Sequence, residues 1–317
     1  MRTRRHVVLD RFGPPEVMRW AEGEMPVPGD GEALVAVETI GVNFADTMVR
    51  RGEYRRDQPL SFTPGFEVGG RLADGTPVVA FCEDGGGYAD HVVVPLDRIF
   101  PVLDDVAVGD AVTLFTQGTT AWYALHRYGR VRPGESVLVH AAAGGLGAMT
   151  VMLAAHHGAR VIATASTPEK LALAREAGAG ETLIADPATL TQAVRDVTGG
   201  RGADVVVDGV GGDLFTPSLR ALAFGGRYVV AGSASQAPAT LDVRALMPRG
   251  QTISGILVRR VAEEDPAEPR AAFEQVQALF RDGIVRPRVT RVADLAEAHR
   301  LIESRQATGK LVYDLPH

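Results

Sequence analysis

The sequence predicts an α/β protein in which a β-rich region precedes a doubly wound parallel sheet. Three observations predict this class. Strand-like and helix-like segments alternate from about residue 112 onward, a glycine-rich turn joins one such strand to the next helix, and the preceding region contains only short Val-rich runs. Alternation of this kind is typical of βαβ units, which build a parallel sheet covered by helices on both faces.

The β-rich region is expected to be an antiparallel domain with long loops. Its clearest strand-length runs are Ala33–Val37, Thr76–Phe81 and Tyr88–Val94, and clusters of Gly, Pro and Asp separate them. Such punctuation is typical of strands joined by turns.

The alternating region supplies the parallel sheet. Its expected strands are Ser136–Ala141, Arg160–Ala165, Glu181–Ala185, Asp204–Asp208 and Arg227–Gly232. Its expected helices are Leu146–His157, Pro168–Ala177, Thr189–Thr198 and Pro217–Ala223. The tail is expected to add helices at Pro269–Arg281 and Leu295–Arg305 and a last strand at Lys310–Asp314.

Composition excludes several classes of protein. The 317 residues are 45% hydrophobic and 23% charged, which suits one or two domains with a large core. A net charge of -6 gives no basic footprint for a nucleic acid. The basic start is followed by only the apolar run Val7–Leu9, against about 7–15 apolar residues in a signal peptide. No stretch approaches the ~18 apolar residues of a membrane span, so we expect a cytoplasmic protein without a membrane partner.

The glycine-rich turn predicts a dinucleotide site. Read against G-x-G-x-x-G, the six positions run from Ala142 to Gly147, with alanine in place of the first glycine. Gly144, Gly145 and Leu146 would let the backbone approach a pyrophosphate at the start of the helix, and Gly147 would let the helix pack closely on the strand. The alternative is an ordinary tight turn between a strand and a helix.

The end of the next strand predicts which nucleotide binds. NAD specificity usually needs a carboxylate about 20 residues beyond the turn. Ser166 and Thr167 stand there with hydroxyls, and Lys170 follows one turn later. These groups suit a 2′-phosphate and favour NADPH, with Glu169 expected to point away. A solvent-exposed helix lysine is the alternative for Lys170.

Several motifs together resemble one family. They are GVNFADTMVRRGEY at 41–54, TPGFEVGG at 63–70, QGTTAWYAL at 117–125, HAAAGGLG at 140–147 and TGKLVY at 308–313. The chain is similar to the zinc-free, ζ-crystallin-like quinone oxidoreductase group of the medium-chain dehydrogenase/reductase superfamily. The resemblance implies a GroES-like catalytic domain at 1–116 and 260–317, with a Rossmann NADP-binding domain inserted at 117–259. It also implies a homodimer that pairs edge strands such as Thr252–Val258.

The zinc ligands of related alcohol dehydrogenases are missing. The resemblance places Asn43 where those enzymes have a ligand Cys and Phe66 where they have a ligand His, and only Glu67 remains. A catalytic zinc needs three protein ligands. The one cysteine, Cys82, lies elsewhere, and a single cysteine also excludes an intrachain disulfide and a cysteine-rich metal site. We therefore expect no metal.

Hydride chemistry without a metal suits an acceptor that is already activated, such as a quinone or an α,β-unsaturated carbonyl. The resemblance makes three residues candidates for catalysis. Asn43 would donate from its amide, Tyr54 would lie beside the nicotinamide as a proton donor, and Thr120 would contact the nicotinamide amide or ribose. The alternatives are a turn-stabilising Asn43, a loop aromatic packed on the catalytic domain at Tyr54, and a helix N-cap at Thr120.

Further cofactor contacts follow from matching motifs. Gly232 and Ser233 end a strand at the carboxyl edge where dinucleotides lie. The resemblance adds Ile256 and Leu257, in the segment ISGILV, and Lys310, for which a surface lysine is the alternative. The chain departs from some relatives at 184–186, where no Tyr or His is present to face the 2′-phosphate.

Two other functions remain open at this stage. One is a 2-enoyl thioester reductase, for which Arg55 and Arg56 beside Tyr54 are the only candidate docking residues. The other is a non-catalytic NADPH-binding protein of the same fold, because a fold alone does not fix an activity.

Overall fold

The computed structural model describes residues 2–54 and 59–316. Contacts between residues divide the chain into two units, one made of residues 1–116 and 288–317 and the other of residues 117–287. We had expected the second boundary at 260. Helix α8 (Ala267–Arg281) instead packs on α7 (Val258–Glu264), and its Val276 leaves no room for a side chain at Gly118. The sequence pattern identifies a helix but not the unit on which it packs.

The unit at 117–287 is built on a six-stranded parallel sheet. Its order is β10-β9-β8-β11-β12-β13, the doubly wound order in which the chain starts in the middle and reverses once. The strands are β8 (Ser136–Val139), β9 (Arg160–Ala165), β10 (Glu181–Ile184), β11 (Ala203–Asp208), β12 (Leu222–Val230) and β13 (Thr252–Gly255). Every residue of β8 and β11 is buried, as expected for central parallel strands covered on both faces.

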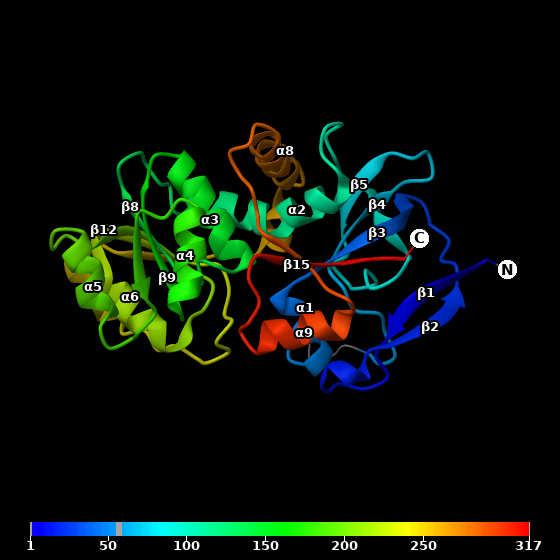
Figure 1. Cartoon of the computed structure of the whole chain (residues 1–317), viewed down its shortest axis with the longest axis horizontal. Coiled ribbons are helices and arrows are strands. Elements are labelled where there is room, and N and C mark those ends of the chain that lie inside the picture. The colour runs from blue at the N-terminus through cyan, green and yellow to red at the C-terminus, as the bar shows by residue number, and fades with distance from the viewer. Residues whose placement is uncertain (1, 55–58, 317) are drawn as a thin grey trace. The chain divides into compact units, whose positions relative to one another are not determined.

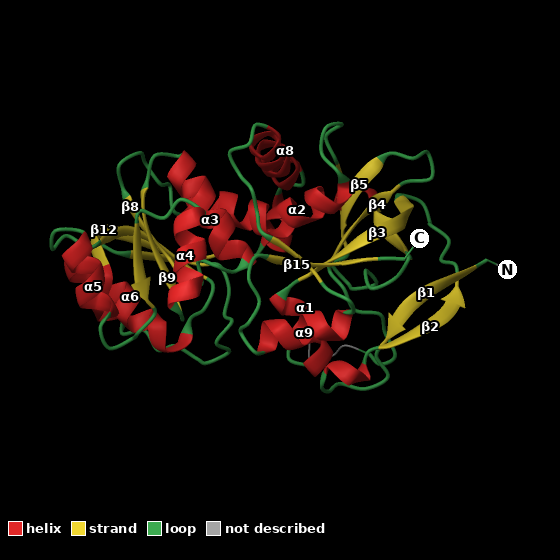
Figure 2. Ribbon diagram, viewed as in Figure 1, coloured by secondary structure: helices red, strands yellow, loops and turns green. Residues whose placement is uncertain are grey.

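Helices connect these strands and cover the sheet (Figures 1 and 2). They are α3 (Gly145–His156), α4 (Pro168–Glu176), α5 (Leu190–Val197) and α6 (Phe215–Ala221), with α7 and α8 following the last strand. Thr167 caps α4, Pro168 occupies its first position, and Gly178 follows it at φ 109°. Local sequence signals therefore set both ends of this helix.

The last strand of this sheet is shorter than expected. We had expected a strand over Thr252–Val258, but β13 ends at Gly255 and α7 begins at Val258. Ile256 still donates its N–H to the carbonyl of Val230 at 2.9 Å before the chain turns into the helix. A short apolar run does not by itself distinguish a strand from a helix that follows it directly.

The other unit is a mostly antiparallel β domain. Its main sheet runs β14-β15-β3-β4-β5-β7, with β6 also paired to β3, and β1 pairs with β2 separately. The strands are β1 (Thr3–Val8), β2 (Arg19–Glu24), β3 (Glu32–Val42), β4 (Glu67–Arg71), β5 (Pro77–Phe81), β6 (His91–Pro95), β7 (Ile99–Pro101), β14 (Val289–Arg291) and β15 (Lys310–Asp314). The C-terminal β15 lies directly against β3, so the end of the chain completes the first domain, as the resemblance implied.

Among the described residues, three α-helices belong wholly or partly to this unit. Helix α1 (Phe44–Arg51) follows β3, α9 (Leu295–Glu303) precedes β15, and α2 (Val108–Tyr123) contains the boundary between the units. Buried side chains of the strands, among them Val35, Ile40 and Val68, form the core beneath α9 together with Tyr88 from the loop before β6. This core fixes the end of β3, from which the candidate site is built.

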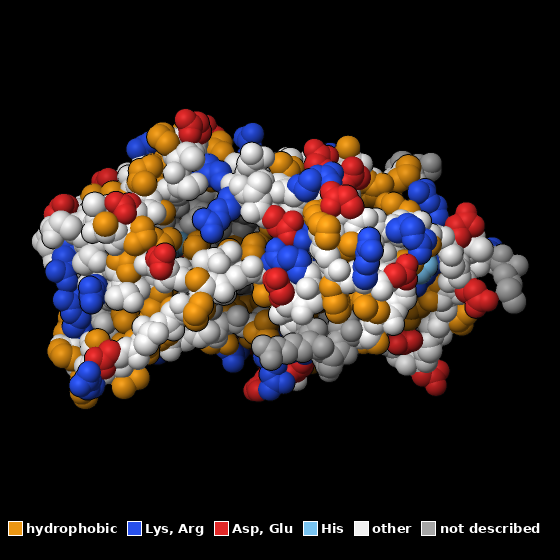
Figure 3. All heavy atoms as spheres, turned by 90° about the horizontal axis from the view of Figure 1, so that it is seen from below, with side chains coloured by type: hydrophobic (Ala, Val, Ile, Leu, Met, Phe, Trp, Pro, Cys, Tyr) orange, Lys and Arg blue, Asp and Glu red, His pale blue; other side chains and the backbone are white. Residues whose placement is uncertain are grey.

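Two features of the whole chain bear on its partners. Among the described residues, no helix is long and apolar enough to cross a bilayer. On the face drawn in Figure 3, basic and acidic side chains are interspersed and do not form a stripe of one sign.

Candidate active site

The first candidate residue, Asn43, lies where β3 ends and α1 begins. It has extended backbone angles and stands at the N-cap of α1. Its N–H donates to the carboxylate of Asp46 at 2.7 Å, which closes the first turn of the helix. The turn-stabilising role that we gave as an alternative for Asn43 is therefore present, carried by its backbone.

The side chain of Asn43 has a second environment, which the sheet register creates. Gly41 on β3 pairs with Glu67 on β4, and Val42 pairs with Leu311 on β15. The neighbouring strands therefore bring Glu67 and Lys310 to the end of β3 on either side. Residues separated by 24 and 267 positions in the chain thus meet at Asn43.

These three side chains form a buried polar cluster. The ammonium of Lys310 donates to Asn43 Oδ1 at 2.9 Å and forms an ion pair with Glu67 Oε2. Asn43 Nδ2 donates to the same Glu67 oxygen at 3.2 Å, and the Thr116 N–H donates to Glu67 Oε1 at 2.8 Å. Lys310 and Glu67 are only 2% and 0% exposed.

The surface position that we gave as an alternative for Lys310 is therefore wrong. Its ammonium is directed at Asn43 and Glu67, so its described contacts place it in this cluster. The sequence left Lys310 undecided because nothing local shows that β15 pairs with β3.

Gly41 makes room for the ion pair. A Cβ at this position would lie 2.7 Å from Glu67 Oε2 and 3.1 Å from Lys310 Cε. The first distance is shorter than real Cβ contacts and the second is tight, so a side chain at Gly41 would displace the Glu67 carboxylate or the Lys310 stem.

A second polar group lies beneath this cluster. Burial raises the pKa of Asp46 to about 7, although Asn43 and the charge of Lys310 act in the opposite direction. In the same core, the Tyr88 hydroxyl and His299 Nε2 are hydrogen-bonded at 2.9 Å. Burial lowers the pKa of His299 to about 3, helped by the charges of Arg50 and Arg51. The sequence pattern marks neither Asp46 nor His299 as an ionisable core residue.

Tyr54 lies in the loop after α1. It is 38% exposed, and its ring packs against Phe66 with 5.3 Å between the ring centroids. Phe66 stacks in turn on Phe81. The packing that we gave as an alternative for Tyr54 is thus present, and the exposed part of the ring remains accessible. Arg55 and Arg56, which we considered for carrier docking, lie outside the described residues.

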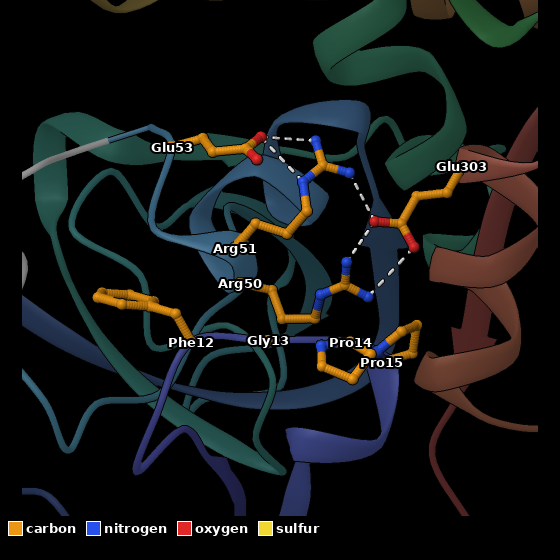
Figure 4. Close-up of a pocket in the computed structure, with 8 residues that line it drawn as sticks. All are labelled: Phe12, Gly13, Pro14, Pro15, Arg50, Arg51, Glu53 and Glu303. Atoms are coloured by element: carbon orange, nitrogen blue, oxygen red, sulfur yellow. Dashed lines mark hydrogen bonds and ion pairs between the residues drawn. The ribbon is translucent and has the colours of Figure 1, made fainter.

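An ion-pair cluster fixes the chain just before Tyr54 (Figure 4). Arg51 donates to Glu53 Oε2 at 2.9 Å and to Glu303 Oε1 at 2.6 Å, and Arg50 forms an ion pair with the same Glu303. These side chains line a recess of about 500 Å³ together with Phe12 and residues 13–15. The cluster connects the end of α1 to the end of α9.

The cluster around Asn43 does not fit a zinc ion. The two positions that carry zinc ligands in related enzymes hold an amide and a phenyl ring, and the remaining carboxylate is already paired with the ammonium of Lys310. None of these except Glu67 belongs to the usual zinc ligands. Cys82 is buried, and burial raises the pKa of its thiol to about 12. Within residues 2–54 and 59–316, no group of three metal-binding side chains is present.

The unit at 117–287 carries the glycine turn. Gly144 is the N-cap of α3, and the turn before it contains Ala141 in the left-handed region at φ 49°. A Cβ on Gly147 would overlap the carbonyl oxygen of Ala141. The helix therefore approaches the turn as closely as the dinucleotide fingerprint requires, and its first N–H groups are available to an anion.

A buried histidine anchors this turn from below. Ser218 donates its hydroxyl to the Leu214 carbonyl at 2.6 Å, so it accepts from His140 Nε2 at 2.7 Å. His140 Nδ1 then accepts from the Thr164 hydroxyl at 2.7 Å. Burial lowers the pKa of His140, which keeps the ring neutral as this arrangement demands.

The predicted 2′-phosphate residues lie at the start of α4. Ser166 is exposed just beyond β9, and the Thr167 oxygen accepts from the Lys170 N–H at 3.4 Å as the helix cap. Glu169 does not point away. Hydrogen bonds from its own backbone N–H and from the Thr167 hydroxyl lower the pKa of its carboxyl. A carboxylate thus lies beside the expected phosphate position.

The remaining predicted contacts lie at the carboxyl ends of strands, apart from Thr120. A Cβ on Gly232 would lie 3.0 Å from the carbonyl oxygen of Gly209, so the loops after β12 and β11 are in close contact, and Ser233 is exposed beside them. Ile256 packs into an apolar cluster, and Leu257 is 44% exposed at the N-cap of α7. Thr120 lies inside α2, so the N-cap alternative for it is wrong.

A buried carboxylate that we did not predict from the sequence shapes this edge. Asp208, at the end of β11, accepts from the N–H groups of Val210 and Gly211 at 2.7 and 3.0 Å and from the Tyr228 hydroxyl at 2.5 Å. It holds the loop that contacts Gly232. The available signal was an Asp at the end of a Val-rich strand, followed directly by the glycine-rich stretch at 209–212.

Comparisons with known proteins agree with this architecture. Residues 29–104 match the family described as alcohol dehydrogenase GroES-like domain, and residues 145–277 match the family described as zinc-binding dehydrogenase. The quinone oxidoreductase of Sus scrofa is 30% identical over 317 residues, which cover 95% of each chain. A 2-haloacrylate reductase from Burkholderia sp is 31% identical over 328 residues, which cover 96% of this chain and 97% of the relative.

A solved structure shows the same fold with a cofactor. A mycobacterial protein complexed with NADPH superposes with a TM-score of 0.92 and 32% identity over 98% of this chain and all of the other. Fold and site together define an oxidoreductase built from a GroES-like domain and a Rossmann domain. The chain belongs to the zinc-free, quinone oxidoreductase-like group of the medium-chain dehydrogenase/reductase superfamily.

Proposed function

We propose that this protein uses NADPH to reduce a quinone or an α,β-unsaturated carbonyl compound without a metal. The observation that carries the proposal is the cluster at the end of β3, where Asn43 is bonded to a buried Glu67–Lys310 ion pair in the place of a metal site. An amide supplies a hydrogen bond and not a Lewis acid. Such a site suits an acceptor whose conjugation already makes it electrophilic.

The glycine turn supports NADPH as the cofactor. The N–H groups at the start of α3, within Gly144–Gly147, suit a pyrophosphate, and the hydroxyl of the exposed Ser166 suits a ribose phosphate. The mycobacterial structure with NADPH has this fold. When bound, NADPH supplies the hydride. We assign the nucleotide contacts to residues 144–147, Ser166, Thr167, Lys170, Gly232, Ser233, Ile256, Leu257 and Thr120.

The other unit supplies the groups for the acceptor. Asn43 donates from its amide to the acceptor oxygen, where negative charge develops as the hydride arrives. Tyr54, partly exposed beside Phe66, donates a proton to the enolate carbon of an enone. A quinone needs no such acid, because its hydroquinone anion is weakly basic.

The proposal is tested by measuring NADPH oxidation with benzoquinone, naphthoquinone, short enones and a crotonyl thioester. We expect turnover with at least one quinone or enone. Turnover with the thioester alone would favour the enoyl reductase. NADPH binding without turnover on any acceptor would favour a non-catalytic protein. The Burkholderia relative, named for an activated alkene, supports including haloacrylates.

We also propose that the protein forms a homodimer through the Rossmann sheet. Strand β13 ends the strand order, and Phe224 and Met247 near its start are 84% and 74% exposed. Open strand edges and large exposed apolar side chains favour association. Analytical ultracentrifugation should give a dimer, and F224K/M247K should give a folded monomer. A monomeric wild-type protein would contradict the proposal.

A further inference from the structure

The buried ion pair at the end of β3 has no solvent-facing role, because neither Lys310 nor Glu67 is exposed. Burying two charges costs free energy that their mutual attraction only partly returns, and apolar residues often serve stability equally well. A buried pair at a candidate active site therefore calls for a functional reason.

The chemistry of the pair fixes the orientation of the Asn43 amide. An ammonium can only donate, so the Asn43 atom that Lys310 contacts at 2.9 Å must be the carbonyl oxygen. An ionised carboxylate can only accept, so the atom that faces Glu67 at 3.2 Å must be the amide nitrogen. The pair thus excludes the flipped amide.

The same pair strengthens Asn43 as a donor. A cation at the amide oxygen draws electron density away from the nitrogen, and hydrogen bonds in series reinforce one another in a dry interior. One N–H of Asn43 is used by Glu67. The other reaches the Gly41 carbonyl at only 3.5 Å, the outer limit of a hydrogen bond. The bond to Gly41 is therefore the longer and weaker of these two hydrogen bonds of the Asn43 amide.

We infer that Glu67 and Lys310 are positioning residues that orient and polarise the Asn43 amide toward the acceptor oxygen. The inference rests on the proposed function, because it assumes that Asn43 contacts the acceptor. The Thr116 N–H supports this arrangement by donating to Glu67 Oε1, the oxygen that Lys310 does not contact. Gly41 supports it by leaving space for the ion pair.

The test is a mutant cycle between the pair and Asn43. The double variant E67Q/K310M removes both charges and leaves no unpaired buried ion. We expect its kcat to fall about tenfold, the equivalent of one weakened hydrogen bond to a developing charge, with the NADPH dissociation constant unchanged. Asn43→Ala should lower kcat at least as much. Adding E67Q/K310M to Asn43→Ala should cause less than about a twofold further loss, because the pair acts through Asn43.

The results that would contradict the proposed function differ from those that would contradict the inference. Full activity of Asn43→Ala would remove Asn43 from the proposed function. If Asn43→Ala loses activity but E67Q/K310M keeps the wild-type kcat, the inference is overturned while the proposed function stands. Weaker NADPH binding in E67Q/K310M, or independent losses in the triple variant, would also overturn it. If E67Q/K310M does not fold, Lys310→Met alone removes the cation at the Asn43 oxygen, and the Glu67 carboxyl left behind can take up a proton. Wild-type kcat in Lys310→Met would then overturn the inference.

Discussion

Asp46 and His299 share one buried core, and their pKa values move in opposite directions. Burial raises the pKa of Asp46 from 3.8 to about 7, and it lowers the pKa of His299 from 6.5 to about 3. Between about pH 4 and 6.5, folded Asp46 holds a proton that the unfolded chain releases, while unfolded His299 binds a proton that the folded chain excludes. The first effect makes stability fall as pH rises, and the second makes it rise.

In a variant that lacks one of the two groups, the other group alone should determine how the free energy of unfolding changes with pH. We predict that Asp46→Asn gains stability with rising pH in this window and that His299→Gln loses it, each by about 1.4 kcal/mol per pH unit at most. In the wild type the two contributions nearly cancel. Urea unfolding at several pH values checks the prediction. Slopes of the same sign in the two variants would show that one of the assigned protonation states is wrong.

The variant Tyr54→Phe distinguishes a role of Tyr54 in acid catalysis from a role in packing alone. Phenylalanine would keep the contact with Phe66 and lose only the hydroxyl. We predict that Tyr54→Phe slows enones by about 10²–10⁴-fold and quinones only mildly, because only the enolate needs a positioned acid. Rates are compared at saturating NADPH. Wild-type rates on all acceptors would leave Tyr54 as a packing residue.

We predict that cofactor choice depends on two neighbouring charges at the start of α4. If Lys170 contacts the 2′-phosphate, Lys170→Ala should raise the NADPH dissociation constant about ten- to a hundredfold and leave that of NADH nearly unchanged. Glu169→Gln should tighten NADPH relative to NADH, because the Glu169 carboxylate lies beside Thr167. Fluorescence titration with both nucleotides measures each ratio. Equal shifts for the two nucleotides would place both residues away from the phosphate.

At the scale of elements, the glycine turn joins β8 to α3. The two pack so closely at Gly147 that a side chain there would overlap the Ala141 carbonyl. We predict that Gly147→Ala weakens NADPH binding by about tenfold or more, since a displaced helix end loses at least one bond to the pyrophosphate. Gly180→Ala is the matched control, because a Cβ there has no neighbour closer than 3.8 Å. Wild-type affinity in Gly147→Ala would mean that the turn does not bind the dinucleotide.

Elements with strong local signals could be predicted from the sequence. The strand Arg160–Ala165 and the start of the helix at Pro168 are confirmed, because β-rich composition, an N-cap threonine and proline act locally. The end of β13 could not be predicted, since the residues before Val258 suit a strand as well as the approach to a helix. Lys310 required the pairing of β15 with β3, which no local pattern contains.

At the scale of the whole molecule, the glycine turn and the nucleotide fold follow from the sequence, and the family is confirmed by the comparisons. The assignment of residues 260–287 failed because it depends on tertiary packing of α8. The absence of zinc ligands could be read from Asn43 and Phe66. The ion pair of Glu67 with Lys310 could not be predicted from the sequence, because Lys310 lies at the other end of the chain.

The central claim is that an amide held by an ion pair replaces a metal in this reductase. The most direct measurement compares acceptor-dependent NADPH oxidation before and after exhaustive chelation, with metal analysis of the same samples. The account predicts equal rates and no stoichiometric zinc. A rate that is lost on chelation and restored by zinc would contradict it.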